Sequence, residues 1–322
     1  MDNTISPILQ ARITQTNTNN SGNIQQKPDL TTKSDSVELS TKPKMSKGKK
    51  ALIIAGAVVG ALAVTAGVIA LIYKGQIKSI QKEGAAIQEK AQKVVDEFME
   101  KFKNVQPLED GSKVIEEFAQ DGKTLARKAT LDADDFLAIN DYANKTRIEA
   151  EKGVLDSFCK KVEFLEDGAY KYKKFFSFTD GKLSALVKNF QKNADGSWSV
   201  KTSMDFEDGK LSALSKNHQT NADGSFSFKT SMVFEDGKLR CLSKNFQKNA
   251  DGSRSEGIGI DFKDGKLHRF IKNYQENADG SRSEGREIKF KDGKLHRFVK
   301  NYQENADGTW SADKDKYFGK DK

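Results

Sequence analysis

The sequence predicts an α+β protein with four parts: a disordered tail, a single transmembrane helix, a helical segment and an antiparallel β-meander of 28-residue hairpin repeats. Three observations support this prediction. An uncharged apolar run is followed by apolar residues at heptad spacing, and five near-identical turns recur every 28 residues in the C-terminal half. The predicted parts are residues 1–50, 51–73, 74–158 and 159–322.

The first part, residues 1–50, is polar and basic, with eight Lys or Arg against four Asp or Glu. It is rich in Asn, Thr, Ser and Gln. Such a stretch cannot bury enough apolar surface to offset its chain entropy, so we expect disorder. An apolar run follows the basic residues directly, which favours a membrane-flanking cluster over nucleic acid as the partner of this charge.

The second part reads ALIIAGAVVGALAVTAGVIALIY, from Ala51 to Tyr73, and its 23 residues carry no charge. At about 1.5 Å per residue, a helix of this length spans a hydrocarbon core of ~30 Å. Five lysines precede the run closely and three follow it, which favours a cytoplasmic N-terminus and extracytoplasmic repeats. We therefore expect a single-pass membrane protein.

Small residues in this run would let a second helix approach closely, and they are the candidate helix-association residues: Gly56, Gly60, Ala63 and Gly67. A heptad seam then runs through Ile77, Ile80, Gly84, Ile87, Ala91, Val94 and Phe98. This seam predicts either a coiled coil or a face that packs on the helices that follow. Residues 51–103 are thus the candidate interface of a homo-oligomer, and we expect two more helices at Ser112–Ala129 and Asp132–Phe158.

The fourth part carries two sets of Asp-Gly turns with the same 28-residue period. NADGS or NADGT begins at Asn193, Asn221, Asn249, Asn277 and Asn305, and DGKL begins at Asp180, Asp208, Asp236, Asp264 and Asp292. Runs of about ten residues separate these turns. Asp-Gly between alternating runs is a strong hairpin signal, so each unit is predicted to be one pair of strands.

Turn chemistry also predicts the register of the strands. Asn-Ala-Asp-Gly suits a type I turn with a G1 bulge, which pairs Asn193 with Ser197 and places Phe190 beside Val200. We take the Glu-Asp-Gly turn to be of the same kind. The result is one apolar face, made of Leu186, Phe190, Trp198, Val200, Met204 and Phe206. This face fades along the chain, which predicts a long single sheet, twisted or curled onto the helical segment.

Three stretches resemble known families. The NADGS turns resemble those of choline- and glucan-binding cell-wall repeats, which would imply a cell-envelope glycan-binding protein, although only Trp198 and Trp310 are present. The DGKL hairpins resemble bacterial YwqK-type repeats, a MORN-like variant, which implies an interaction scaffold. Residues 1–26 resemble the export signal of a type III secreted effector, which implies a virulence protein inserted in a host membrane.

The candidate binding residues are the lysines that recur before Asn in each unit, with the aromatic residues near them: Lys188, Lys216, Lys244, Lys272, Lys300, Phe270, Tyr274, Phe298 and Tyr302. Such a ladder could bind an acidic polymer or a protein. The alternative is a solvated sheet surface whose charges discourage edge-to-edge aggregation.

Nothing in the sequence indicates catalysis. No nucleophile stands with a base, and no cofactor fingerprint is present. His268 and His296 would lie two strands, about 9.5 Å, apart, too far to share a metal ion. We therefore expect no enzyme activity, cofactor or metal. The predicted function is a membrane-anchored bacterial repeat protein whose sheet is a macromolecular interaction scaffold. The alternatives are a type III secreted effector in a host membrane and a cell-envelope glycan-binding protein.

Overall fold

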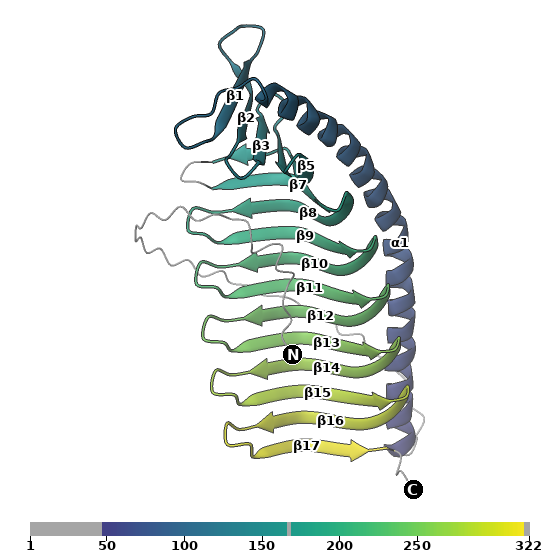
Figure 1. Cartoon of the computed structure of the whole chain (residues 1–322). Coiled ribbons are helices and arrows are strands. Elements are labelled where there is room, and N and C mark those ends of the chain that lie inside the picture. The colour runs from purple at the N-terminus through teal and green to yellow at the C-terminus, as the bar shows by residue number, and fades with distance from the viewer. Residues whose placement is uncertain (1–46, 166–168, 319–322) are drawn as a thin grey trace. The chain divides into compact units, whose positions relative to one another are not determined.

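A computed structural model of the chain describes residues 47–165 and 169–318, and the side chains of residues 47–74 lie outside that description. One long helix, α1, covers Lys47–Phe102, and the other described elements are strands (Figure 1). The predicted disorder of residues 1–50 and the export-signal resemblance of residues 1–26 fall almost wholly outside the described part, so both stay predictions.

In the described part of the chain, seventeen antiparallel strands follow α1 and form one sheet in which nearly every strand pairs with the next. The exception is the short β6, because β5 and β6 both pair with β7. The strands before the repeats are β1 (Lys113–Phe118), β2 (Leu125–Leu131), β3 (Phe136–Asp141), β4 (Thr146–Glu151), β5 (Val154–Lys160) and β6 (Glu163–Phe164). The antiparallel β-meander is therefore confirmed.

The repeats form the longer strands of the sheet. They are β7 (Tyr170–Thr179), β8 (Lys182–Lys192), β9 (Trp198–Glu207), β10 (Lys210–Thr220), β11 (Phe226–Glu235), β12 (Lys238–Lys248), β13 (Arg254–Lys263), β14 (Lys266–Glu276), β15 (Arg282–Lys291), β16 (Lys294–Glu304) and β17 (Trp310–Tyr317). Each 28-residue unit supplies one hairpin, as the sequence predicts.

The helices expected at Ser112–Ala129 and Asp132–Phe158 are wrong, since these residues form β1–β5. Their buried apolar residues alternate, as Leu137 with Ile139 and Ile148 with Ala150 do, and a period of two is the strand period. The turns between the strands contain residues at positive φ, including Asp135, Lys145 and Lys152 in the left-handed region, which a continuous helix cannot accommodate. The helical part of residues 74–158 thus ends at Phe102.

The transmembrane prediction is also corrected. Within the described part of the chain, no helix combines the length and the apolar character needed to span a membrane. This finding contradicts the single transmembrane helix at Ala51–Tyr73 and, with it, the single-pass topology with cytoplasmic N-terminus and extracytoplasmic repeats. The backbone of this stretch is the first part of α1, whereas its side chains, including those of the predicted helix-association residues, lie outside the described part.

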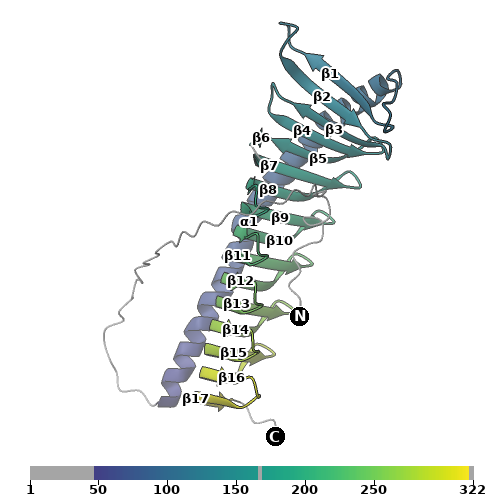
Figure 2. The ribbon, with the colours of Figure 1, turned by 90° about the vertical axis from the view of Figure 1, so that its left-hand side faces the viewer.

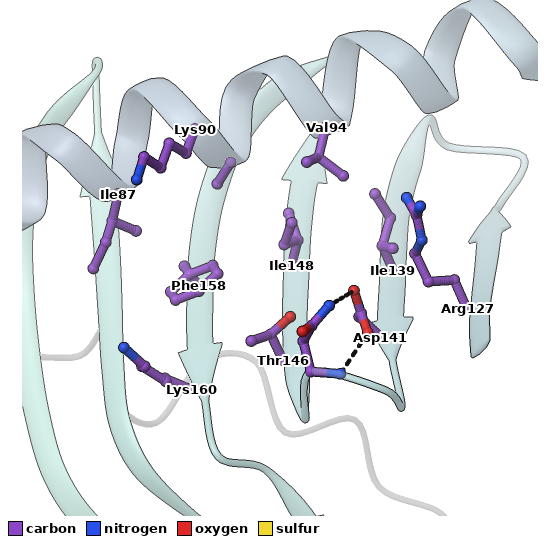
Figure 3. Close-up of a pocket in the computed structure, with 12 residues that line it drawn as sticks. Ile87, Lys90, Val94, Arg127, Ile139, Asp141, Thr146, Ile148, Phe158 and Lys160 are labelled. Carbon is purple, nitrogen blue, oxygen red and sulfur yellow. Dashed lines mark hydrogen bonds between the residues drawn. The ribbon is translucent and has the colours of Figure 1, made fainter. Parts of the chain in front are cut away.

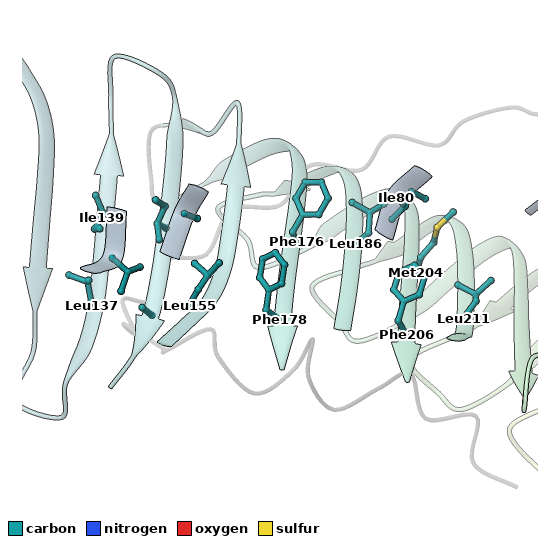
Figure 4. Close-up of a cluster of buried hydrophobic side chains, with 14 of the residues drawn as sticks. Ile80, Leu137, Ile139, Leu155, Phe176, Phe178, Leu186, Met204, Phe206 and Leu211 are labelled. Carbon is teal, nitrogen blue, oxygen red and sulfur yellow. The ribbon is translucent and has the colours of Figure 1, made fainter. Parts of the chain in front are cut away.

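The heptad seam of α1 packs on the sheet within the same chain. Ile80, Ala91 and Phe98 of the seam are buried, and so is Val95 beside it. They form one apolar core with side chains of the sheet, including Phe176, Phe178, Leu186, Met204 and Leu211 (Figure 4). Figure 2 shows α1 on one side of the single-layered sheet. We call the sheet face in contact with α1 the helix face, and the other one the outer face.

Seven residues of α1 match one hairpin repeat. The side-chain amide of Gln81 donates a hydrogen bond of 2.5 Å to the carbonyl oxygen of Gly209, and Gln88, seven residues later, lies against Gly181, one repeat earlier. Seven helical residues rise about 10.5 Å, close to the ~9.6 Å between every second strand. The seven-residue spacing of the apolar side chains in α1 therefore matches the spacing of successive hairpins in the sheet.

The two kinds of turn differ from each other. In the NADG turns the prediction is confirmed: the N–H of Asn193 donates to the carbonyl of Ser197 at 2.9 Å, and Gly196 has a φ of 86°. The turns that begin the DGKL segments are instead two-residue turns. Glu207 pairs with Lys210, and the two residues between them, Asp208 and Gly209, both have positive φ. A bulge after Leu211 shifts the register by one residue, so that Leu214 still faces Met204.

The predicted single apolar face is wrong, because the repeat strands change face midway. Leu186 belongs to the core with α1, whereas Val187 and Phe190 pack together with Val200 in a separate cluster. Side chains alternate between faces in a regular strand, so Val187 and Phe190 could not share one. Asn189 between them has a φ of 51°, a left-handed conformation that reverses the alternation. The equivalent asparagines behave alike: Asn217, Asn245, Asn273 and Asn301.

Candidate functional site

The predicted lysine ladder lies on the helix face. Lys188 stands directly opposite Lys174, whose ammonium contacts the carboxylate of Glu83 on α1 at 2.5 Å. Residues directly opposite each other in an antiparallel pair share a face, so the ladder continues across the strands on this side. From β8 to β12, Thr202 and Thr230 separate the lysines, so cations there recur only every second strand.

In the C-terminal repeats the ladder becomes continuous. Lys272 of β14 faces Arg286 of β15, Arg286 faces Lys300 of β16, and Lys300 faces Lys314 of β17. We call these four residues the cation row. At about 4.8 Å per strand the row spans ~14 Å. Like charges directly opposite each other destabilise a sheet. Lys272, Lys300 and Lys314 are exposed and Arg286 is partly exposed, so all four can reach solvent.

Phe298 lies directly beside the cation row. Its ring has the guanidinium carbon of Arg286 at 6.0 Å from the centroid and the Lys314 ammonium at 5.7 Å. Cation–π attraction of this kind contributes about 0.5–1 kcal/mol at exposed sites and offsets part of the repulsion within the row. Asp313, beside the row, accepts a hydrogen bond of 2.6 Å from the Asn301 amide.

The structure separates the predicted binding residues into two groups. Phe270 and Phe298 lie on the helix face with the lysines. Phe270 packs on the core with α1, and Ile288 stands directly opposite both residues in the sheet, so that Phe298 shares the face of Phe270. Tyr274 and Tyr302 come after the left-handed asparagines and lie on the outer face.

The outer face carries a ladder of aromatic rings that the sequence analysis did not identify. Between β7 and β12, successive rings have centroids 4.7–6.4 Å apart, and Phe190 and His218 are only 5% exposed. Its members are Tyr170, Tyr172, Phe190, Trp198, His218, Phe226, Phe228 and Phe246. The aromatic residues recur in the repeats of the sequence. Only the change of face at the left-handed asparagines, however, shows that they lie on the same face of the sheet.

The rings of this ladder stack on each other. Tyr172 and Phe190 are 9° from parallel at 4.7 Å, and Phe228 and Phe246 are 6° from parallel at 4.8 Å. Stacked rings cover one another's faces, so the ladder presents mainly ring edges to solvent. Sugars stack on open ring faces, and this geometry therefore gives no support to the predicted glycan-binding alternative.

Toward the C-terminus the outer face becomes ionic. Arg254 pairs with Glu276 at 2.6 Å and lies over the ring of Tyr274, and Arg282 with Glu304 and Tyr302 repeats the arrangement one unit later. Beside them, Arg269 contacts two buried carboxylates, Glu287 at 2.7 Å and Glu284 at 3.3 Å. Burial raises the pKa of the Glu284 carboxyl, and the neighbouring Glu287 carboxylate raises it further.

A separate groove lies between α1 and the strands β2–β5, with a volume of about 330 Å³. Its lining combines apolar side chains with three cations and one carboxylate: Ile87, Lys90, Ala91, Val94, Arg127, Ile139, Asp141, Asn144, Thr146, Ile148, Phe158 and Lys160 (Figure 3). Across the described residues, no group of three or more His, Cys, Asp or Glu side chains is placed to hold a metal ion.

Comparisons with known proteins give little guidance. No family model matches the chain, and no curated protein matches it. Among solved structures, a mutant of the TCP10 domain of Danio rerio CPAP is similar at 15% identity and a TM-score of 0.21, covering 67% of this chain and 99% of that one. The wild-type domain in complex with a peptide of Danio rerio STIL is similar at 16% identity and a TM-score of 0.16, over 66% and 98%. At such scores the likeness carries no conclusion about function.

Proposed function

We propose that this protein is a non-catalytic interaction scaffold whose cation row binds an acidic segment of a partner protein. The observation that carries the proposal is the direct pairing of four cationic residues across four adjacent strands. The repulsion between these like charges destabilises the sheet while no partner is bound. An anionic partner would be attracted to all four residues and would relieve this repulsion.

The surroundings of the row favour a protein over other polyanions. Phe270 and Phe298, both partly exposed, lie directly beside it on either side of the buried Ile288, and interfaces between proteins combine aromatic residues and Arg. A single-stranded nucleic acid needs open aromatic faces for stacking, but the Phe298 ring is already in contact with Arg286 and Lys314.

The test is fluorescence anisotropy of a labelled glutamate-rich peptide titrated with the full chain at low and moderate salt. We expect saturable binding that weakens with salt, because exposed charges are screened. The variant K272Q/R286Q/K300Q/K314Q should lose at least about tenfold in affinity. The matched control K210Q/K238Q/K266Q/K294Q removes four exposed lysines of the DGKL segments, and its affinity for the peptide should fall less than about threefold.

Equal losses in the two variants would show attraction to net charge alone and would contradict the proposal. Polyphosphate of the same charge that binds as tightly as the peptide would contradict the choice of a protein partner. The bacterial YwqK-type resemblance and the export signal of residues 1–26 remain predictions, and secretion of a reporter fused to residues 1–50 tests the latter.

A further inference from the structure

The groove between α1 and β2–β5 has a continuous apolar floor. Ala91 of α1 is buried there. Ile139 of β3 and Ile148 of β4 are also buried, and Val94 and Phe158 are partly buried at its sides (Figure 3). A volume of about 330 Å³ falls at the small end of natural ligand pockets, which run from ~300 to 1,000 Å³. An alkyl chain or a single apolar moiety fits this floor.

The charges of the groove are arranged unevenly along it. Lys90 of α1 and Lys160 at the end of β5 flank Phe158 at one end, whereas Arg127 and Asp141 lie at the other (Figure 3). Arg127 is engaged by the Glu117 carboxylate at 3.1 Å, and the Asp141 carboxylate accepts hydrogen bonds of 2.8 and 2.9 Å from Asn144. Both lysines are exposed and no acidic side chain lines their end of the groove.

The walls of the groove are held in place. Gln92 donates a hydrogen bond of 2.8 Å to the carbonyl of Gly153 and accepts one of 2.9 Å from the N–H of Leu155. These two bonds join α1 to the β4–β5 hairpin next to the groove. A site whose walls are fixed before binding loses less entropy when a ligand enters.

We propose that this groove binds a small amphipathic carboxylate. The alkyl part lies on Val94, Ile139 and Ile148, and the carboxylate lies between the ammonium groups of Lys90 and Lys160. The Asp141 carboxylate repels the anionic end from the opposite side and so fixes the direction of the ligand. This site is independent of the cation row, and neither proposal needs the other.

The experiment is isothermal titration calorimetry of the full chain with octanoate, octanol and octylammonium, each in a separate titration. These three probes share one alkyl chain and differ in head-group charge. We expect octanoate to bind saturably at one site per chain, and the other two to bind at least about tenfold more weakly, the value of one or two hydrogen bonds to charged groups.

Two variants locate the site. K90A/K160A should weaken octanoate binding at least about tenfold, whereas K78A/K93A removes two exposed lysines from the same helix outside the groove and should leave it unchanged. Absence of saturable octanoate binding, equal binding of octanol or octylammonium, or equal losses in the two variants would each overturn the proposal. Thermal unfolding of every variant shows whether a loss of binding reflects a loss of fold.

Discussion

Leu186 and Phe190 lie four residues apart in β8, yet their side chains are on opposite faces of the sheet. Leu186 packs in the core with α1, whereas Phe190 stacks on Tyr172 of the outer face. The left-handed Asn189 between them produces this change. Because the same asparagine recurs in every repeat, each hairpin contributes apolar residues to both faces.

The first prediction concerns Asn189 itself. A non-glycine residue in the left-handed region costs about 1–2 kcal/mol, and Asn bears this better than most residues. We expect Asn189→Val to lower the free energy of unfolding by at least about 1 kcal/mol and Asn189→Gly to change it by less than half as much. Urea unfolding followed by circular dichroism measures both. A harmless valine would contradict the conformational role of Asn189.

Gln92 provides the second prediction. Gln92→Ala leaves the Gly153 carbonyl and the Leu155 N–H without their partner from α1. We expect a loss of about 1–3 kcal/mol in the free energy of unfolding, since two partly buried backbone groups lose hydrogen bonds. Gln76, exposed on the same helix, supplies the control, and Gln76→Ala should be nearly neutral. Similar effects of the two changes would mean that the contact contributes nothing specific.

The third prediction uses the ladder histidine. Burial lowers the pKa of His218 from 6.5 to about 4. The unfolded chain therefore binds a proton more readily between pH 6.5 and 4, and stability falls as the pH drops through this window. His218→Phe, which places in β10 the residue found at the equivalent Phe190 and Phe246, should remove that loss. At pH 5 we expect a gain of about 2 kcal/mol beyond any change at pH 8.

Urea titrations of the wild-type chain and His218→Phe at pH 8 and pH 5 provide the measurement. A difference in the free energy of unfolding between the two proteins that is the same at pH 8 and pH 5 would contradict a neutral, buried His218. Stacking alone would change stability equally at both pH values.

Asp205 gives a fourth prediction of opposite sign. Asp205 pairs with Ala185 and Ala213 of the flanking strands, and burial raises the pKa of its carboxyl from 3.8 to about 6. The folded chain holds the proton more tightly, so this group weakens the fold as the pH rises from 3.8 to 6. Asp205→Asn should therefore stabilise the protein by about 1–3 kcal/mol at pH 7 and have little effect at pH 3.5.

Comparison of melting temperatures at pH 7 and pH 3.5 tests this expectation. Asp195→Asn is unsuitable as a control, because that turn carboxylate accepts hydrogen bonds from Ser197 and its pKa is lowered. A gain for Asp205→Asn that is equally large at pH 3.5 would contradict a raised pKa.

The sequence was sufficient to predict the hairpin repeats, because Asp-Gly turns depend on local backbone geometry that two or three residues determine. The NADG register, with Asn193 bonded to Ser197, follows for the same reason. The change of face at Asn189 could not be predicted so readily, because mid-strand asparagine usually adopts an extended conformation. Its only signal was the recurrence of Lys-Asn in every unit.

Other features depended on contacts distant in sequence. The heptad seam through Ile80 and Ala91 was correctly located, but a coiled coil and a sheet whose repeat matches seven helical residues require the same spacing. The strands β1–β5 were missed because their short alternating runs also fit helical patterns. Lys272 and Lys300 were predicted as binding residues, whereas Arg286 and Lys314 were not, because only the strand pairing places them between and beside the lysines.

The central claim is that α1 covers the Leu186 side of the sheet in a fixed register and leaves the Phe190 side to the aromatic ladder. A Cβ atom at Gly84 would lie 3.5 Å from the Cβ of Leu183, a distance suited to a disulfide. In a chain with Cys159 and Cys241 replaced by Ala, oxidised G84C/L183C should form the intramolecular disulfide nearly completely, and G84C/F190C should form none. Equal cross-linking of the two pairs, or none in G84C/L183C, would contradict the account.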